Sequence, residues 1–156
     1  MDHLPISTWG RAFAAGIAGA VTLTTVHQLA RKVTADAPRM DVLGQRAIAR
    51  TAQRIGGTRP EQPSLYRMAL AGDLFANSAY YSLIACGPNA RPWTRAVTLG
   101  VAAGVGALTL PQRIGLGRAP KRDRVPNQIM TIAWYLLGAL ATAATAECLR
   151  PRRTAA

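Results

Sequence analysis

Four stretches of the chain contain no Asp, Glu, Lys or Arg over about the thickness of a membrane. They are Ala12–Ala30, Leu74–Ala90, Ala96–Gln112 and Val125–Ala146. A helix needs roughly 20 mostly apolar residues, with a range of about 17–25, to cross the hydrocarbon core. We therefore predict an all-α integral membrane protein with one domain, residues 1–156, built as a four-helix bundle. The four predicted transmembrane spans cover approximately residues 9–30, 65–86, 93–110 and 127–149.

A soluble, alanine-rich helical bundle is the main alternative, because the mean hydropathy is only +0.09. This low value arises because the charge-free stretches contain Ala, Gly and Thr as often as Leu and Ile. Small residues are common where transmembrane helices pack closely. Ala12–Val26 and Ile129–Ala146 also lack the polar stripe that a helix on a soluble surface needs. Both observations favour the membrane.

The connection between the first two spans predicts a basic amphipathic helix over approximately residues 37–55. Asp36 with Pro38 is typical of a helix start, and Gly56 with Gly57 is typical of a stop. Apolar residues fall on one face, and arginines recur every four residues on another. We expect Arg46, Arg50 and Arg54 to bind anionic lipid head groups. A cap packed over the end of the bundle is an alternative that is compatible with this role.

The distribution of basic residues predicts the topology. Thirteen of the 19 Lys and Arg residues lie in segments 31–67 and 113–124, on one predicted side of the membrane. The other six are Arg11, Arg91, Arg95, Arg150, Arg152 and Arg153. By the positive-inside rule, loops 31–64 and 111–126 face the cytoplasm and both termini face outside, in a plasma membrane of the bacterial inner-membrane type.

The net charge of +12 does not predict nucleic-acid binding. The basic residues lie in the connections between spans, where positive charge sets topology and attracts anionic lipids. No array of alternating aromatic and basic residues, suited to stacking bases, is present. We therefore expect membrane lipid as a partner, together with other membrane subunits or a second copy, and no nucleic acid.

Asp73 is the most informative single residue, because it lies inside the second predicted span. A carboxylate within a span costs a few kcal/mol on insertion scales, so it faces the bundle or a wet cavity. Ala69, Asp73, Asn77 and Tyr80 share one helical face. This stripe predicts either a proton or ion site or a clasp between helices.

His27 is expected at a depth similar to that of Asp73. It lies about 6 Å inside Arg31, and Asp73 about 9 Å inside Arg67, at about 1.5 Å per residue. A His–Asp pair there would serve as a pH-sensitive contact or proton relay. The alternative for His27 is snorkelling at a helix end. The complete polar cluster predicted at this end is His27, Gln28, Asp73, Asn77, Gln112, Asn127 and Gln128.

Small residues and cysteines give weaker signals. Gly100 and Gly104 form a GxxxG pattern that permits close helix approach, within the bundle or between subunits, and Gly16 and Gly72 begin similar patterns. Cys86 and Cys148 both lie at the predicted outer ends of their spans. Either a disulfide or two free thiols fits that position. Glu147 and Arg150 predict a surface ion pair.

No catalytic motif is present. The sequence contains no HExxH, GxSxG or phosphate-binding loop, and no metal or cofactor site is predicted. The small size, small-residue helix faces and basic loops favour a non-enzymatic accessory or assembly subunit of a membrane complex. A small ion, proton or solute transporter or channel subunit that uses Asp73, Asn77 and His27 is the alternative. A lipid-acting membrane enzyme is the second alternative.

Overall fold

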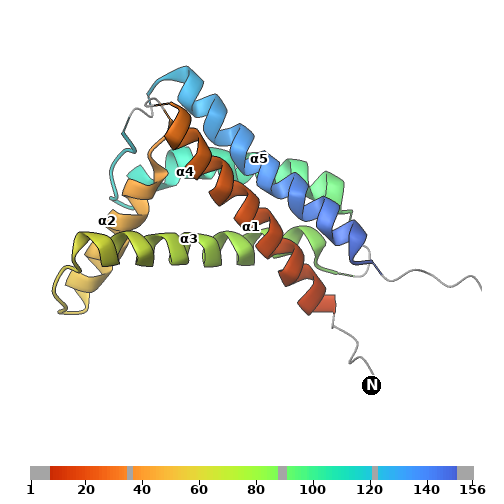
Figure 1. The fold of residues 1–156 in the computed structure, drawn as a ribbon, viewed down its shortest axis with the longest axis horizontal. Coiled ribbons are helices and arrows are strands. Elements are labelled where there is room, and N and C mark those ends of the chain that lie inside the picture. The colour runs from red at the N-terminus through yellow and green to blue at the C-terminus, as the bar shows by residue number, and fades with distance from the viewer. Residues whose placement is uncertain (1–7, 35–36, 88–90, 121–122, 151–156) are drawn as a thin grey trace, which may run out of the picture.

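A computed structural model describes residues 8–34, 37–87, 91–120 and 123–150. Within these ranges all regular structure is helical (Figure 1). The helices are α1 (Thr8–Val33), α2 (Met40–Arg54), α3 (Gln62–Ala85), α4 (Pro92–Arg113) and α5 (Val125–Cys148). Successive long helices run in opposite directions, and α1 lies beside α5, so that the first and last helices are neighbours. The short helix α2 lies at the end where α1 finishes and α3 begins.

Proline and glycine mark most of the helix boundaries. Helices α3, α4 and α5 each have a proline in the first or second position, where the missing N–H is not needed. The connection after α2 contains Gly56 at φ +77°, a conformation that favours glycine. Four of the approximate predicted boundaries differ from the helix ends by three residues: α1 ends at Val33 rather than 30, and α3 begins at Gln62 rather than 65. Helix α2 begins at Met40 rather than 37, and α4 continues past 110 through Pro111 to Arg113, although this proline has no N–H to donate to the preceding turn. The predicted cap at Asp36 lies outside the described residues.

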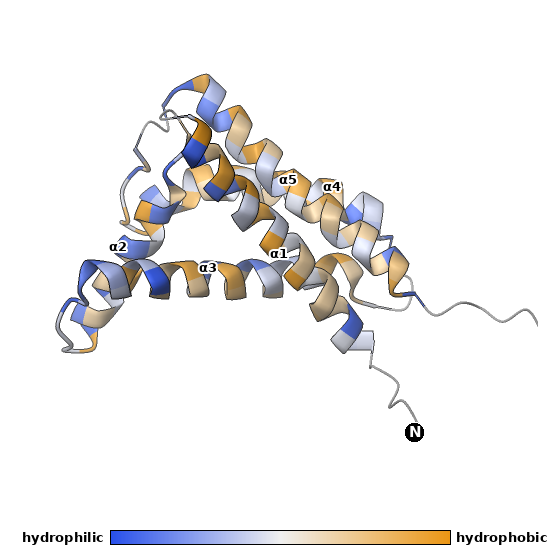
Figure 2. Cartoon of the chain, in the orientation of Figure 1, coloured by the Kyte–Doolittle hydropathy of each residue, from blue (hydrophilic) through white to orange (hydrophobic). Residues whose placement is uncertain are grey.

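Three helices, α1, α4 and α5, are long and apolar enough to cross a membrane. Figure 2 shows how hydrophobic residues dominate much of α4 and α5. The prediction of membrane spans is thus supported for three helices, which indicates a membrane protein. Helix α3 is 24 residues long but is not among the three, because Arg67, Asp73 and Asn77 reduce its hydropathy.

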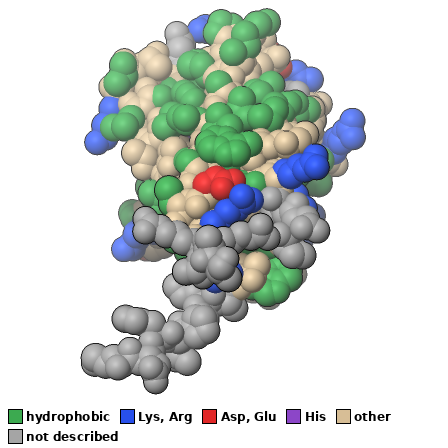
Figure 3. Space-filling view, turned by 90° about the vertical axis from the view of Figure 1, so that its right-hand side faces the viewer, with side chains coloured by type: hydrophobic (Ala, Val, Ile, Leu, Met, Phe, Trp, Pro, Cys, Tyr) green, Lys and Arg blue, Asp and Glu red, His purple; other side chains and the backbone are tan. Residues whose placement is uncertain are grey.

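The outward faces of the long helices are rich in large apolar side chains. Phe13, Ile17 and Val21 are exposed on α1, and Phe75 is 69% exposed on α3. Hydrophobic side chains also gather over the end of the molecule that Figure 3 presents. A helix in water would carry polar residues on such a face, whereas a helix in lipid would not. These surfaces therefore favour a bilayer as the surrounding medium.

The core lies where α1, α3 and α5 cross, and its helices approach to backbone contact. A Cβ atom at Gly16 would overlap Ser78 O of α3 and lie 2.8 Å from Ser82 N. A Cβ atom at Gly19 would overlap the Thr142 hydroxyl of α5 and lie 2.5 Å from Gly138 O. Only glycine fits at these two crossings.

The GxxxG pattern of α4 is used within the chain. A Cβ atom at Gly100 would lie 2.9 Å from Leu136 Cα, and one at Gly104 would lie 2.6 Å from Ile132 Cα. Both glycines thus pack against α5. Gly72 behaves differently, because a Cβ atom there would meet nothing within 4 Å.

Candidate functional site

A cavity of about 70 Å³ lies between α1, α2 and α3, on the side where α2 covers the bundle. Its walls are partly apolar, with contributions from Leu70 and Met40. The polar residues that line it are Thr24, His27, Gln28, Arg31, Asp41, Tyr66 and Asp73. A space of this size and polarity holds a few water-sized groups. It brings together His27, Gln28 and Asp73 of the predicted polar cluster.

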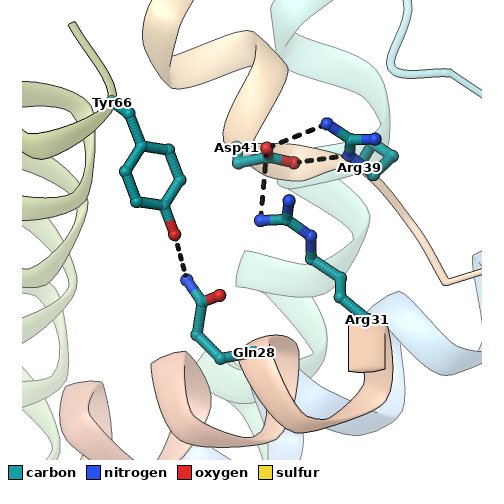
Figure 4. Close-up of polar contacts among 5 residues, drawn as sticks. All are labelled: Gln28, Arg31, Arg39, Asp41 and Tyr66. Carbon is teal, nitrogen blue, oxygen red and sulfur yellow. Dashed lines mark hydrogen bonds and ion pairs between the residues drawn. The ribbon is translucent and has the colours of Figure 1, made fainter. Parts of the chain in front are cut away.

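Asp41 joins α1 and α2 at the rim of the cavity (Figure 4). Its carboxylate accepts from Arg31 Nη1 of α1 at 3.2 Å and from Arg39 Nε at 3.1 Å. The hydrogen bond with Asp41 raises the pKa of Arg39 above its ordinary value. Near these two ion pairs of Asp41, Gln28 Nε2 of α1 donates to the Tyr66 hydroxyl of α3 at 2.8 Å. Two polar contacts therefore connect α1 to its neighbours at this end.

We expect Asp41→Asn to loosen α2. The Asp41 side chain is only 14% exposed and the Arg31 side chain 27% exposed, so the lost ion pair costs about 1 kcal/mol. Hydrogen–deuterium exchange of the α2 amides should accelerate by roughly fivefold. Glu147→Gln is the matched control, because it removes an ion pair at the opposite end. Unchanged α2 exchange in Asp41→Asn would show that the carboxylate does not hold the helix.

His27 is held by aromatic rings of α5. Its ring meets Trp134 edge to face with centroids 4.8 Å apart, and Tyr135 in the same manner at 6.2 Å. His27 Nε2 is buried and has no hydrogen-bond partner among the described residues. The same is true of Thr24 Oγ1, one turn earlier on α1. Buried polar atoms are normally satisfied by protein or by water. These two atoms expose almost no surface, so they belong to the packed interior beside the cavity rather than to the surface that a cavity occupant could touch.

Asp73 lies on the α3 wall, with its side chain exposed. Its carboxyl group is hydrogen-bonded to Asn77 one turn later. It forms no ion pair with the part of the chain that the structure describes. The predicted direct pair with His27 is not present, because each residue takes a different neighbour. The two side chains line one cavity without bonding to each other.

The other members of the predicted cluster do not line this cavity. Gln112 accepts a hydrogen bond from Arg118 Nε at 3.2 Å. Asn127 is buried at the start of α5, where its carbonyl accepts from the Thr131 hydroxyl at 2.8 Å. Gln128 is half-buried on the same turn. The predicted cluster is therefore divided between the cavity and the α4–α5 end.

Thr24, Asp41 and Tyr66 were not recognised from the sequence as cavity residues. Asp41 offered one signal, since it and Asp36 are the two acids of the strongly basic segment 31–59. An acid among arginines commonly pairs with one of them. Thr24 and Tyr66 offered no comparable signal, because both types are common in helices of this kind.

The arginines of α2 contact the connection between α4 and α5. Arg46 Nη1 donates to Leu116 O at 3.2 Å and to Arg118 O at 2.9 Å, and Arg50 Nη1 donates to Gly115 O. Arg54 is exposed at the end of α2. Arg46 and Arg50 also line an open groove with Arg59. The helix therefore packs over the end of the bundle and keeps a basic outer surface.

Cys86 is half-buried and Cys148 is exposed, and both are free thiols. Among the described residues, no group of three or more His, Cys, Asp or Glu side chains is placed to hold a metal ion. Comparison with protein-family models, curated proteins and solved structures finds no match for this chain. Function must therefore be inferred from the geometry alone.

Proposed function

We propose that this protein is a non-enzymatic subunit of a membrane assembly and that it crosses the bilayer four times, with α3 as the fourth span. The 24 residues of α3 extend about 36 Å, enough to cross the hydrocarbon core. Arg67 lies near the start of the helix, where it can reach head groups. Asp73 lines a polar cavity, which lowers the cost of placing a carboxylate within a span.

The observation that carries the assembly role is the outer face of α4. One face of this helix packs on α5 through Gly100 and Gly104. Another face presents a shallow apolar groove, in which a row of valines lies beside a row of small residues. The groove residues are Val97, Thr98, Val101, Ala102, Val105, Gly106, Thr109 and Leu110. Thr98, Ala102 and Gly106 recur every four residues, the spacing that lets a second transmembrane helix approach closely. We infer that the groove binds an apolar helix that carries its own small-residue face.

Replacement of Ala102 by Leu should abolish the assembly. The larger side chain fills the groove and prevents close helix approach. Native mass measurement after mild detergent extraction should give wild-type particles heavier than the 16.6 kDa chain, and Ala102→Leu particles of the single chain. Ala133→Leu is the matched control, since Ala133 is exposed on α5 outside the groove. A wild-type protein that always migrates alone, with no partner in membrane cross-linking, would contradict the proposal.

Lipid binding by α2 belongs to the same proposal. The groove lined by Arg46, Arg50 and Arg59 presents three guanidinium groups, which attract phosphate oxygens. Arg46 contacts two backbone carbonyls and Arg50 contacts one, in each case through the Nη1 atom. A guanidinium carries five N–H donors, so both arginines retain donors for a head group. This surface lies on the predicted cytoplasmic side.

A transporter or channel subunit remains the second candidate, favoured by Asp73 in the cavity. The packing beyond the cavity weighs against it as a path through one chain. Leu23 and Tyr81 are fully buried, and Tyr135 is 9% exposed. These residues fill the crossing of α1, α3 and α5 immediately beyond the cavity. A role in binding is therefore better supported than a role in transport.

A further inference from the structure

One carboxylate of α3 has no cation of the described chain to offset its charge. Asp73 is exposed and forms no ion pair with the residues that the structure describes, and its hydrogen bond joins it to Asn77 of the same helix. Arg31 lines the same cavity, but it pairs with Asp41 at 3.2 Å. A carboxylate within a span is costly, and such residues usually pair with an opposite charge. A cation from outside the described chain would remove that cost.

The helix face beside Asp73 is open and made of small residues. Gly72 and Ala76 are exposed and lie four residues apart, and Ala76 is also the neighbour of Asp73 three residues along the helix. A Cβ atom at Gly72 would meet nothing within 4 Å, and Phe75 beside it is 69% exposed. Small residues one turn apart let a second transmembrane helix approach closely. A helix on this face would therefore bring its side chains next to the Asp73 carboxylate.

A second copy of this chain offers no matching cation in its described helices. Two copies with the same topology in one membrane place equal residues at equal depth. Arg67 of α3 lies about 9 Å along the helix from Asp73, at about 1.5 Å per residue, and near the helix start. Every Lys and Arg residue of α1 and α4 lies in the first or last turn, and α5 contains none. The cation is therefore expected from a different subunit.

We propose that the α3 face formed by Gly72, Ala76 and Asp73 binds a transmembrane helix of another subunit, and that a Lys or Arg side chain of that helix pairs with Asp73. An ion pair is worth more in a medium of low dielectric constant than in water. The inference rests on the proposed function, in which α3 is a span and the protein is an assembly subunit. It names a second face, distinct from the α4 groove, and a partner selected by charge.

Binding of synthetic transmembrane peptides to the full-length protein tests the pairing. Both peptides consist of leucine and alanine; one carries a single lysine at the depth of Asp73, and the other carries methionine at that position. Association in vesicles of zwitterionic lipid is measured by energy transfer between labelled peptide and labelled protein. The lysine peptide should bind about tenfold or more tightly than the methionine peptide. Equal affinity for the two peptides would overturn the proposal.

Asp73→Asn should remove the preference for the lysine peptide. Asp123→Asn is the matched control, because Asp123 is an exposed carboxylate that pairs with Arg118 in the connection between α4 and α5. If Asp73→Asn does not fold, Gly72→Leu serves instead, since its larger side chain enters open space in the free protein but blocks the approach of a helix. A wild-type preference for lysine in either folded variant would overturn the proposal.

Two further variants separate this inference from the proposed function on which it rests. Ala102→Leu blocks the α4 groove and should leave the lysine preference unchanged; loss of that preference would place the peptide in the groove and overturn the α3 site. Phe75→Cys, in a chain with both native cysteines replaced by serine, should not react with a membrane-impermeant maleimide. Rapid labelling would show that α3 is not a span and overturn both proposals. No labelling together with no lysine preference would overturn the pairing alone.

Discussion

Gly19→Ala is expected to destabilise the bundle by about 3 kcal/mol or more. The added methyl group would overlap the Thr142 hydroxyl, lie 2.5 Å from Gly138 O and lie 3.1 Å from the Tyr81 ring. Overpacking of a close-packed core costs about 1–3 kcal/mol when side chains can adjust, and occasionally more. Here a backbone carbonyl blocks the methyl, so α1 and α5 must move apart. Unfolding by SDS or urea, followed by tryptophan fluorescence, measures the change.

Gly72→Ala is the matched control for Gly19→Ala. Both substitutions replace a glycine within a long helix, but a Cβ atom at Gly72 meets nothing within 4 Å. Alanine is a better helix former than glycine by about 1 kcal/mol, so Gly72→Ala should be neutral or stabilising. Equal stability of the two variants would show that α1 and α5 do not touch at Gly19.

Tyr81→Ala is expected to cost about 3–5 kcal/mol of folding free energy, the range for removal of a large aromatic side chain. Tyr81 is fully buried at the crossing of α1, α3 and α5. Its hydroxyl donates to Tyr135 O at 2.8 Å, so it also connects α3 to α5. Removal of the side chain leaves an unfilled space lined by Gly19 and Gly138.

Tyr81→Phe separates the hydrogen bond from the packing. The ring stays and only the hydroxyl is lost, so the same unfolding titration should show a cost of about 1 kcal/mol. Tyr80→Phe offers a comparison, because Tyr80 is half-buried and donates to Leu99 O of α4 at 3.0 Å. A cost for Tyr81→Ala no larger than that for Tyr81→Phe would be inconsistent with a packed crossing.

The positions of the helices could be read from charge and hydropathy. Long runs without charge require helices in a membrane, and α1, α4 and α5 follow those runs to within about one turn. The surface ion pair of Glu147 with Arg150 was also predictable, and it is present at 3.0 Å. These features depend on neighbours along one helix, where sequence spacing sets geometry.

The side chains that each polar residue contacts could not be predicted from the sequence. Counting residues from a helix end gives a depth for each side chain, and His27 and Asp73, which have similar depths, both line one cavity. It does not give the rotation of each helix about its own axis or the angle at which two helices cross. Asp73 therefore meets Asn77 on its own helix, while His27 meets aromatic rings of α5.

The arginines of α2 show a similar limit. A basic stripe on an amphipathic helix fits lipid phosphate and backbone carbonyl oxygen equally well. The structure uses Arg46 and Arg50 on carbonyls of the 115–118 connection, where Gly115 and Gly117 have φ of +82° and +79°. Such a turn exposes its carbonyl groups in a way that composition alone does not reveal.

The contact between Gly19 and Gly138 joins α1 to α5, two helices that lie far apart in the sequence. The α4–α5 hairpin can pair as soon as its two neighbouring helices emerge, because its contacts are local in sequence. Helix α1 must wait for α5, and more than a hundred residues separate the two glycines. Until α5 has been translated, the face of α1 that packs against α5 at Gly19 lacks this native contact. The insertion machinery or the lipid must shield this face, so a chain stopped before α5 would lack its central crossing.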